Sequence, residues 1–151
     1  TPLYSSAASD VYKRQPPYRL DWEKRLEWVD ENTRTVTRML MAKVLGLDQA
    51  QHQIHGRDYC VYKGKPSTKS IFAAFLLTKK ALRVRIRTDP LTFKDPEKWT
   101  GEKVYKGWFF KQGQEREFKI TSKEQITYAM ELIKQSYDFS GEKWKSEWKE
   151  A

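Results

Sequence analysis

The stretch that decides the fold is residues 79–90, which read KKALRVRIRTDP. Two kinds of side chain alternate along it, aliphatic and then guanidinium, in the order Leu82, Arg83, Val84, Arg85, Ile86 and Arg87. Successive side chains of a β-strand point to opposite faces of the sheet. The stretch therefore predicts a strand with one aliphatic face for a core and one face that carries three arginines.

The preceding residues predict a partner for this strand. Residues 71–77, IFAAFLL, form a continuous apolar run, which is typical of a central strand covered on both faces. Only a short link, residues 78–81, separates the two runs, so we expect an antiparallel hairpin. Asp89 and Pro90 should end the second strand, because proline donates no ladder hydrogen bond and restricts the residue before it.

Three more strands are expected further along the chain, at residues 57–63, 103–110 and 114–120, the last two joined by a turn at 111–113. In the last strand Phe118 and Ile120 should point inward, and Glu117 and Lys119 outward. Residues 48–56 are polar and predict a loop, and residues 89–102 predict a second loop that Phe93 and Trp99 anchor.

Helical spacing appears on both sides of these strands. Apolar side chains recur every three or four residues over 22–47, which predicts a helix whose stripe packs on a core, in preference to a groove for a partner. Asp21 can cap its start and Gly46 its end, and a break near Asn32 and Thr33 stays open. A second stripe begins at Ile126 and follows two overlapping capping boxes, whose pairs are Thr121 with Glu124 and Ser122 with Gln125.

The expected fold class is α+β, with an antiparallel sheet of about five strands packed with an N-terminal and a C-terminal helix. We expect one domain over residues 16–139, followed by a charged tail at 140–151 that carries Trp144 and Trp148. Residues 1–15 match nothing else in the chain, and we expect an artefactual or disordered leader there. The chain would then be part of a longer protein, whose other domains are possible partners.

The positive charge is concentrated. The 151 residues carry a net charge of +9, and residues 57–88 alone hold nine lysines and arginines against one acid, Asp58. Such a patch is the usual electrostatic footprint of a polyanion partner, and the alternative is a solvated strand face. No apolar run approaches the roughly 20 residues that span a bilayer. The one cysteine, Cys60, fits a reducing compartment, so we expect a soluble cytoplasmic protein.

Catalytic and metal-binding patterns are weak. A loose group of possible metal ligands has no zinc-site spacing; its members are His52, His55, Asp58 and Cys60. Acids flanked by lysines in the 89–102 loop imitate a nuclease site, but Asp89 and Asp95 each precede proline, and turn formation explains them better. The 64–70 loop lacks the spacing of a phosphate-binding loop. We expect no metal, no cofactor and no catalytic residues.

The favoured hypothesis is a non-catalytic nucleic-acid-binding accessory domain. The predicted phosphate contacts are the basic side chains of the 57–88 segment, namely Lys63, Lys65, Lys69, Lys79, Lys80, Arg83, Arg85 and Arg87. Trp108 is the preferred side chain for stacking on bases, with Tyr105 or Trp99 as alternatives. The competing hypothesis is a protein-interaction or assembly module, in which the arginine face meets an acidic partner or packs beneath the N-terminal helix.

Four stretches carry a likeness to known proteins: YCVYKG at 59–64, IFAAFLLTKKALRVRIRTDP at 71–90, the Gly-Trp pair at 107–108, and FKITSKEQITYAMELIKQSYDF at 118–139. Over residues 22–139 the chain resembles a family of small prokaryotic domains of unknown function. These domains occur alone or at the C-terminus of proteins described as predicted transport proteins, some with restriction- or nuclease-like N-terminal regions. The resemblance implies a DNA-processing or defence context, and it supplies no catalytic residues.

Overall fold

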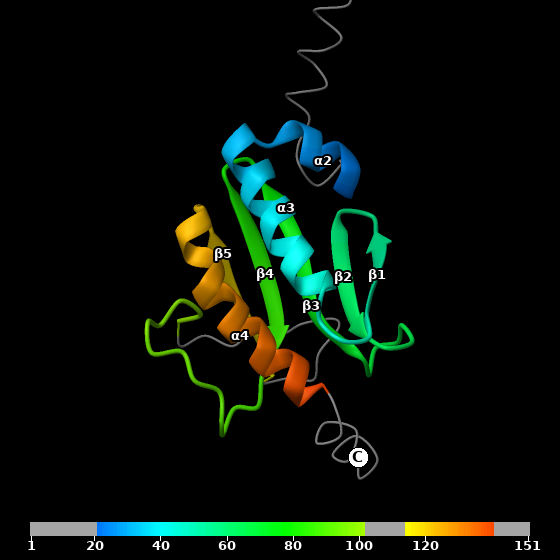
Figure 1. Ribbon diagram of the computed structural model, residues 1–151, viewed down its shortest axis with the longest axis vertical. Coiled ribbons are helices and arrows are strands. Elements are labelled where there is room, and N and C mark those ends of the chain that lie inside the picture. Colours follow the sequence, from blue (N-terminus) through cyan, green and yellow to red (C-terminus); the bar gives the residue numbers. More distant parts are fainter. Residues whose placement is uncertain (1–20, 102–113, 141–151) are drawn as a thin grey trace, which may run out of the picture.

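The computed structural model describes residues 21–101 and 114–140, which form an antiparallel sheet with helices before and after it (Figure 1). Five strands follow one another in space as they do in the chain, in the order β1-β2-β3-β4-β5. Their bounds are Ala50–His55 (β1), Asp58–Lys63 (β2), Ile71–Thr78 (β3), Ala81–Arg87 (β4) and Glu115–Ile120 (β5). The α+β class and the antiparallel five-stranded sheet are confirmed.

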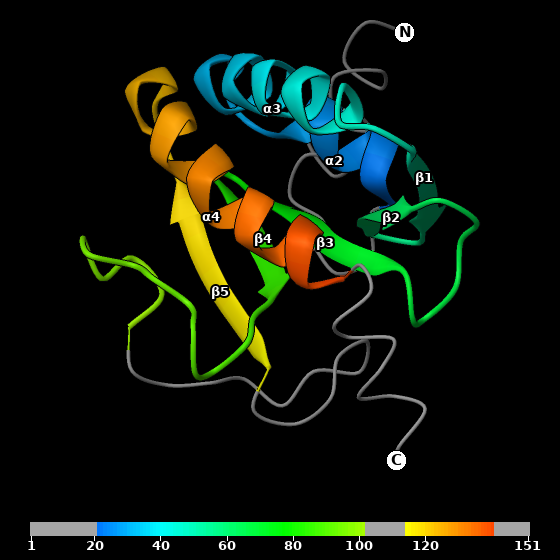
Figure 2. The same ribbon diagram turned by 60° about the horizontal axis from the view of Figure 1, so that its bottom comes forward.

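The helices cover one face of this sheet. Helices α2 (Trp22–Trp28) and α3 (Glu31–Leu45) precede it, and a 3-10 turn, η2 (Lys123–Gln125), leads into α4 (Ile126–Phe139). Figure 2 shows α3 and α4 side by side over the same face, and both contact the central strands. In the described part of the chain, no helix has the length and apolarity to cross a membrane.

The core lies between α3, α4 and the two strands of the predicted hairpin. Every residue of β3 from Ile71 to Leu77 is buried, as its continuous apolar run predicts. On β4 the aliphatic side chains of Leu82, Val84 and Ile86 are fully buried in the main apolar cluster. We call this side the helix face of the sheet, and the opposite side, to which Arg83, Arg85 and Arg87 point, the arginine face.

The N-terminal helix is divided, and the division is set by a capping carboxylate. The Asp30 Oδ1 atom accepts a hydrogen bond from the Thr33 amide at 2.8 Å and so starts α3. The break therefore lies at Val29 and Asp30, slightly before the expected position. Asp21 caps α2 in the same way through the Lys24 amide, and Gly46 ends α3, both as predicted.

The prediction of a loop at residues 48–56 is wrong, because residues 50–55 form the edge strand β1. It pairs along its whole length with β2, from Ala50 opposite Lys63 to His55 opposite Asp58. Gly56 has a φ of 61°, a conformation suited to the tight turn between the two strands. The strand had no visible alternation because residues 51–55 are all exposed, so no face selects apolar side chains.

The start of the C-terminal helix is close to the prediction. Gln125 reaches back, and its Oε1 atom accepts hydrogen bonds from the amides of Thr121 at 2.7 Å and Ser122 at 3.2 Å. Of the two overlapping boxes, these contacts favour the one that contains Gln125. The strand predicted at 103–110, the leader at 1–15 and the tail beyond Ser140 lie outside the described residues.

One side chain of α4 takes part in the sheet itself. The ladder between β3 and β4 ends at the pair Ala73 and Ile86. Beyond it, the Ser136 hydroxyl donates to the Phe72 carbonyl at 2.5 Å and accepts from the Arg87 amide at 2.9 Å. The hydroxyl therefore replaces one backbone rung, and all three groups lie in the buried interior.

Replacing this hydroxyl should be costly. Ser136→Ala leaves a buried carbonyl and a buried amide without their partner, which we expect to lower the free energy of unfolding by about 2–4 kcal/mol. The measurement is urea denaturation followed by circular dichroism. Thr127→Ala removes an exposed hydroxyl from the same helix and should change the stability by less than about 0.5 kcal/mol. Equal stabilities for the two variants would contradict the bridging role.

Candidate nucleic-acid interface

Two arginines of β4 share one carboxylate of β5. The Glu117 Oε1 atom lies 2.8 Å from Arg83 Nη2 and 3.1 Å from Arg85 Nε, and its Oε2 atom lies 2.9 Å from Arg83 Nη2. The Glu117 side chain is 6% exposed, whereas those of Arg83 and Arg85 are 28% and 25% exposed. Glu117 points away from the helix face, as predicted, but it is buried because the guanidinium groups of Arg83 and Arg85 cover it.

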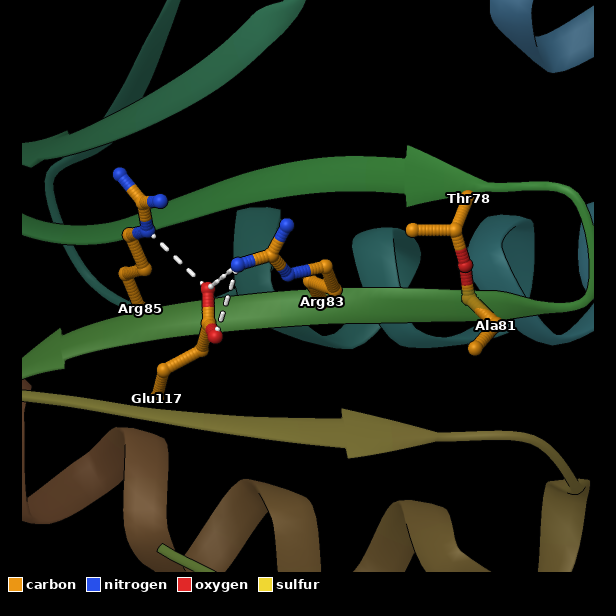
Figure 3. A network of polar contacts seen from close by, with 5 residues as sticks. All are labelled: Thr78, Ala81, Arg83, Arg85 and Glu117. Atoms are coloured by element: carbon orange, nitrogen blue, oxygen red, sulfur yellow. Dashed lines mark hydrogen bonds and ion pairs between the residues drawn. The ribbon is translucent and has the colours of Figure 1, made fainter. Parts of the chain in front are cut away.

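The shared carboxylate fixes how the arginines are presented. Figure 3 shows Glu117 reaching across β4 from β5, while both guanidinium groups lie on the side toward β3. The terminal nitrogens of Arg85 and the second terminal nitrogen of Arg83 point away from Glu117. Within residues 21–101 and 114–140, no hydrogen bond engages these terminal nitrogens. The geometry therefore leaves donors of a planar fork available for another anion.

The arginine stems also cover apolar surface. The register places Arg85 opposite Ala74 and Arg83 opposite Leu76, two side chains of β3 that are 3% and 7% exposed. Arginine commonly lays its aliphatic stem along apolar groups and keeps its charged end accessible. The two residues therefore have a structural role as well as a charge.

Arg87 does not belong to an exposed arginine face, and the prediction of three accessible guanidinium groups is wrong at this position. Arg87 is fully buried, and burial lowers the pKa of its guanidinium group to about 9. Its terminal nitrogens donate to the carbonyls of Thr68 at 3.0 Å and Lys69 at 3.3 Å, and to the Ser140 hydroxyl at 3.3 Å. Arg87 thus fastens the loop between β2 and β3 to the end of β4.

The predicted lysine contacts are divided between the two ends of the sheet. Lys65 and Lys69 are exposed in the β2–β3 loop, and Lys79 and Lys80 are exposed at the tip of the β3–β4 hairpin. The strand between them has eight residues, a span of about 25 Å. The structure therefore does not bring the four lysines together, although it sets each pair near one end of the arginine face.

Two of the predicted lysines have partners within the fold. The Lys63 ammonium lies 4.0 Å from the centre of the Tyr137 ring, and the Lys79 ammonium donates to the Trp28 carbonyl at the end of α2. Both side chains therefore stabilise contacts between the sheet and the helices.

Among the predicted stacking residues, Trp99 lies in the described part of the chain, and it does not lie on the arginine face. Trp99 packs against Tyr128 and Phe118, with its ring centre 4.3 Å from that of Tyr128, which confirms its expected role as a loop anchor. Tyr105 and Trp108 lie outside the described residues.

Acidic residues beside the arginines were missed by the sequence analysis. Glu115 and Glu117 are two residues apart on β5, and the register sets them opposite Arg87 and Arg85. Burial raises the pKa of Glu115, and burial likewise raises that of Asp58 on β2. Acids alternate along EREFKI as arginines alternate along RVRIR. With the register between these two strands, the alternation would indicate that the acids lie opposite the arginines.

Asp89 and Asp95 of the 89–102 loop serve turn formation, as predicted. The Asp89 Oδ1 atom accepts from the Leu91 amide at 3.0 Å. The Asp95 Oδ2 atom accepts from both the amide and the hydroxyl of Thr100 at 2.8 Å, and Oδ1 accepts from the Tyr128 hydroxyl. Burial alone would raise the pKa of Asp95, but the hydrogen bonds from Tyr128 and Thr100 outweigh it and lower the pKa.

The possible metal ligands of residues 52–60 make separate contacts. His52 stacks on Tyr59, whereas the His55 Nε2 atom lies 3.1 Å from the Tyr62 hydroxyl. Cys60 is fully buried, and burial raises the pKa of its thiol to about 12. Across the described ranges 21–101 and 114–140, no three such side chains come close enough to hold a metal ion.

The chain matches no protein-family model, no curated protein and no solved structure. Its function is therefore inferred from the arginine pair, from the basic loop that Arg87 holds, and from the concentration of charge between residues 57 and 88.

The structural role of Arg87 can be separated from any binding role. Arg87→Gln removes a buried guanidinium group and leaves the part-buried carbonyls of Thr68 and Lys69 without its donors, and we expect the free energy of unfolding to fall by about 3 kcal/mol. Arg57→Gln makes the same change of charge at an exposed position and should cost less than about 0.5 kcal/mol. Thermal and urea unfolding measure both. A fully stable Arg87→Gln variant would show that the loop is held by other contacts.

Proposed function

We propose that this chain is a non-catalytic nucleic-acid-binding domain that contacts the phosphate backbone through its arginine face. The observation that carries the proposal is the pair of arginines aligned by Glu117, with terminal guanidinium nitrogens directed away from that carboxylate. Arg83 and Arg85 are its central contacts. Arginine forks match phosphate oxygens in geometry as well as in charge.

Charge and order both favour an anion at this position. One carboxylate shared by two guanidinium groups leaves a net positive charge on the cluster of Arg83, Arg85 and Glu117. Holding the two long side chains in place in the free protein reduces the conformational entropy that binding would otherwise cost. Lys119, exposed and paired with Arg83 in the register, extends the positive charge toward β5.

The β2–β3 loop supplies a second set of cations near the end of β4. Arg87 fixes the backbone of Thr68 and Lys69, and Ser70 donates its hydroxyl proton to the Lys65 carbonyl at 2.8 Å. Exposed lysines are thus carried by a loop of defined conformation. In this proposal Arg87 positions the loop and does not itself contact phosphate, and Lys65 and Lys69 make peripheral contacts.

Such an interface should bind with little sequence preference and strong salt dependence, because phosphate contacts release counterions and carry no base information. The resemblance of residues 22–139 to domains that accompany nuclease-like regions supports a DNA-processing or defence setting. This support is an association between domains and does not specify a mechanism.

A triple variant tests the interface without leaving a buried charge behind. Arg83→Gln, Arg85→Gln and Glu117→Gln together remove the cluster while changing the net charge by only −1. We expect weaker binding at low salt, and a shallower dependence of log K on log salt, by about 2 units for double-stranded DNA. Fluorescence anisotropy with labelled single- and double-stranded DNA and RNA measures both quantities.

The matched control is Lys24→Gln, which also changes the net charge by −1 but lies on α2, where the side chain is exposed. It should bind as the unchanged protein does. Indistinguishable affinities for the triple variant and the unchanged protein, with both folded by circular dichroism, would refute the proposal.

Assembly is the second candidate, and one observation favours it. The edge strand β1 is exposed and contains no lysine, arginine, aspartate or glutamate, although edge strands usually carry charges that prevent pairing with another sheet. If assembly is the function, light scattering after size exclusion should give a specific oligomer that Gln53→Lys dissociates. A monomer at all concentrations would leave nucleic-acid binding as the better account.

A further inference from the structure

A second cationic site lies on the other side of β5 from the arginine face. A cavity of about 350 Å³ opens between the 93–101 loop and β5, and it is lined by Phe93, Asp95, Lys98, Thr100, Gly101 and Arg116. Arg116 pairs with Ile86, whose side chain belongs to the helix face. The cavity therefore shares no residue with the arginine face.

Arg116 is held in place by the fold. Its Nη1 atom donates to the Gly101 carbonyl at 2.9 Å and to the Thr100 hydroxyl at 3.3 Å. The guanidinium carbon lies 5.3 Å from the centre of the Phe93 ring. A guanidinium group fixed on one edge and supported by an aromatic ring is oriented before any ligand arrives.

Lys98 provides the second cation, from an unusual backbone conformation. Its φ is 56°, in the left-handed region that glycine adopts far more readily than lysine. The turn needs only its backbone, because the amide donates to the Asp95 carbonyl at 2.9 Å and its own carbonyl accepts from Gly101. A glycine would satisfy the turn at lower cost, so what the lysine adds is an exposed cationic side chain on a residue that lines the cavity.

The one acid in the lining is already satisfied. Asp95 accepts two hydrogen bonds from Thr100 and one from Tyr128. Its charge offsets one of the two cations, so the lining keeps one net positive charge. The lining thus combines a guanidinium group, a lysine side chain and one aromatic side chain.

We propose that this cavity binds the phosphomonoester group of a small molecule, with Arg116 and Lys98 as its two cationic contacts. A phosphomonoester carries about 1.5 to 2 negative charges at neutral pH and three acceptor oxygens, so it suits two cationic side chains better than a singly charged carboxylate does. A phosphate group alone would leave most of 350 Å³ empty, so the remaining volume suits an attached sugar or polyol.

The test exploits the backbone of Lys98. Lys98→Gly removes the ammonium group and relieves the left-handed strain, so the variant should be at least as stable as the unchanged protein. Its affinity for ribose 5-phosphate should fall at least about fivefold, and Arg116→Lys, which keeps the charge but loses the planar guanidinium group held by Thr100 and Gly101, should weaken binding similarly. Calorimetry measures the affinities, and amide chemical shifts of residues 98–101 locate the ligand.

Gln49→Gly is the matched control, since Gln49 has a φ of 64° and does not line the cavity. It should gain stability in the same way and bind ribose 5-phosphate unchanged. Absence of any phosphate-dependent shift at residues 98–101 with about 10 mM ligand, or equal affinity in Lys98→Gly, would overturn the proposal.

Two further comparisons identify the source of the phosphate. Binding of ribose 5-phosphate together with equal affinity for 5′-phosphorylated and 5′-hydroxyl oligonucleotides supports a small-molecule ligand. Binding confined to the 5′-phosphorylated oligonucleotide would overturn it in favour of a strand end. The triple variant of Arg83, Arg85 and Glu117 should retain ribose 5-phosphate binding, so failure of this site and failure of the nucleic-acid interface are told apart.

Discussion

A single carboxylate allows two arginines of β4 to lie beside a strand whose first seven side chains are all apolar. Water cannot solvate the inner ends of Arg83 and Arg85 fully, because their stems cover Ala74 and Leu76. Charges removed from water are costly unless they are paired and hydrogen-bonded. Glu117 meets this need for both arginines at once, and the β4–β5 register that brings it there is therefore fixed by charge as well as by the apolar pattern.

A second constraint acts at the end of β4, where polar side chains take over from backbone pairing. Ser136 supplies the missing rung between β3 and β4, and Arg87 satisfies the carbonyls of the β2–β3 loop. Sheet, loop and C-terminal helix consequently meet at one buried group of hydrogen bonds. The buried Arg87 therefore helps to position the β2–β3 loop, and with it the exposed lysines Lys65 and Lys69.

The sequence predicts those helices and strands whose buried apolar side chains recur at the period of the element. IFAAFLL and RVRIR indicate the central hairpin, and the stripes beginning at Trp22 and Ile126 indicate the helices. It misses β1 because an edge strand exposed along its length selects no alternation. Arg83 and Arg87 lie on the same side of β4 by strand alternation, yet one is partly accessible and the other is buried. The β2–β3 loop, which is distant in sequence, makes this difference because it contacts Arg87. The partnership of Glu117 and the cavity around Arg116 depend on register and loop packing, which local patterns do not encode.

The hydroxyl that replaces a rung makes one backbone amide a reporter of tertiary structure. The amide of Arg87 is protected by a side chain from a helix 49 residues away, and not by the neighbouring strand. Deuterium can reach it whenever α4 lifts from the sheet, even while the β3–β4 ladder stays closed. Neighbouring amides within the ladder would exchange only when the strands separate. The difference between the two exchange rates would measure, at one residue, how much of the stability of the sheet comes from the helix docked upon it.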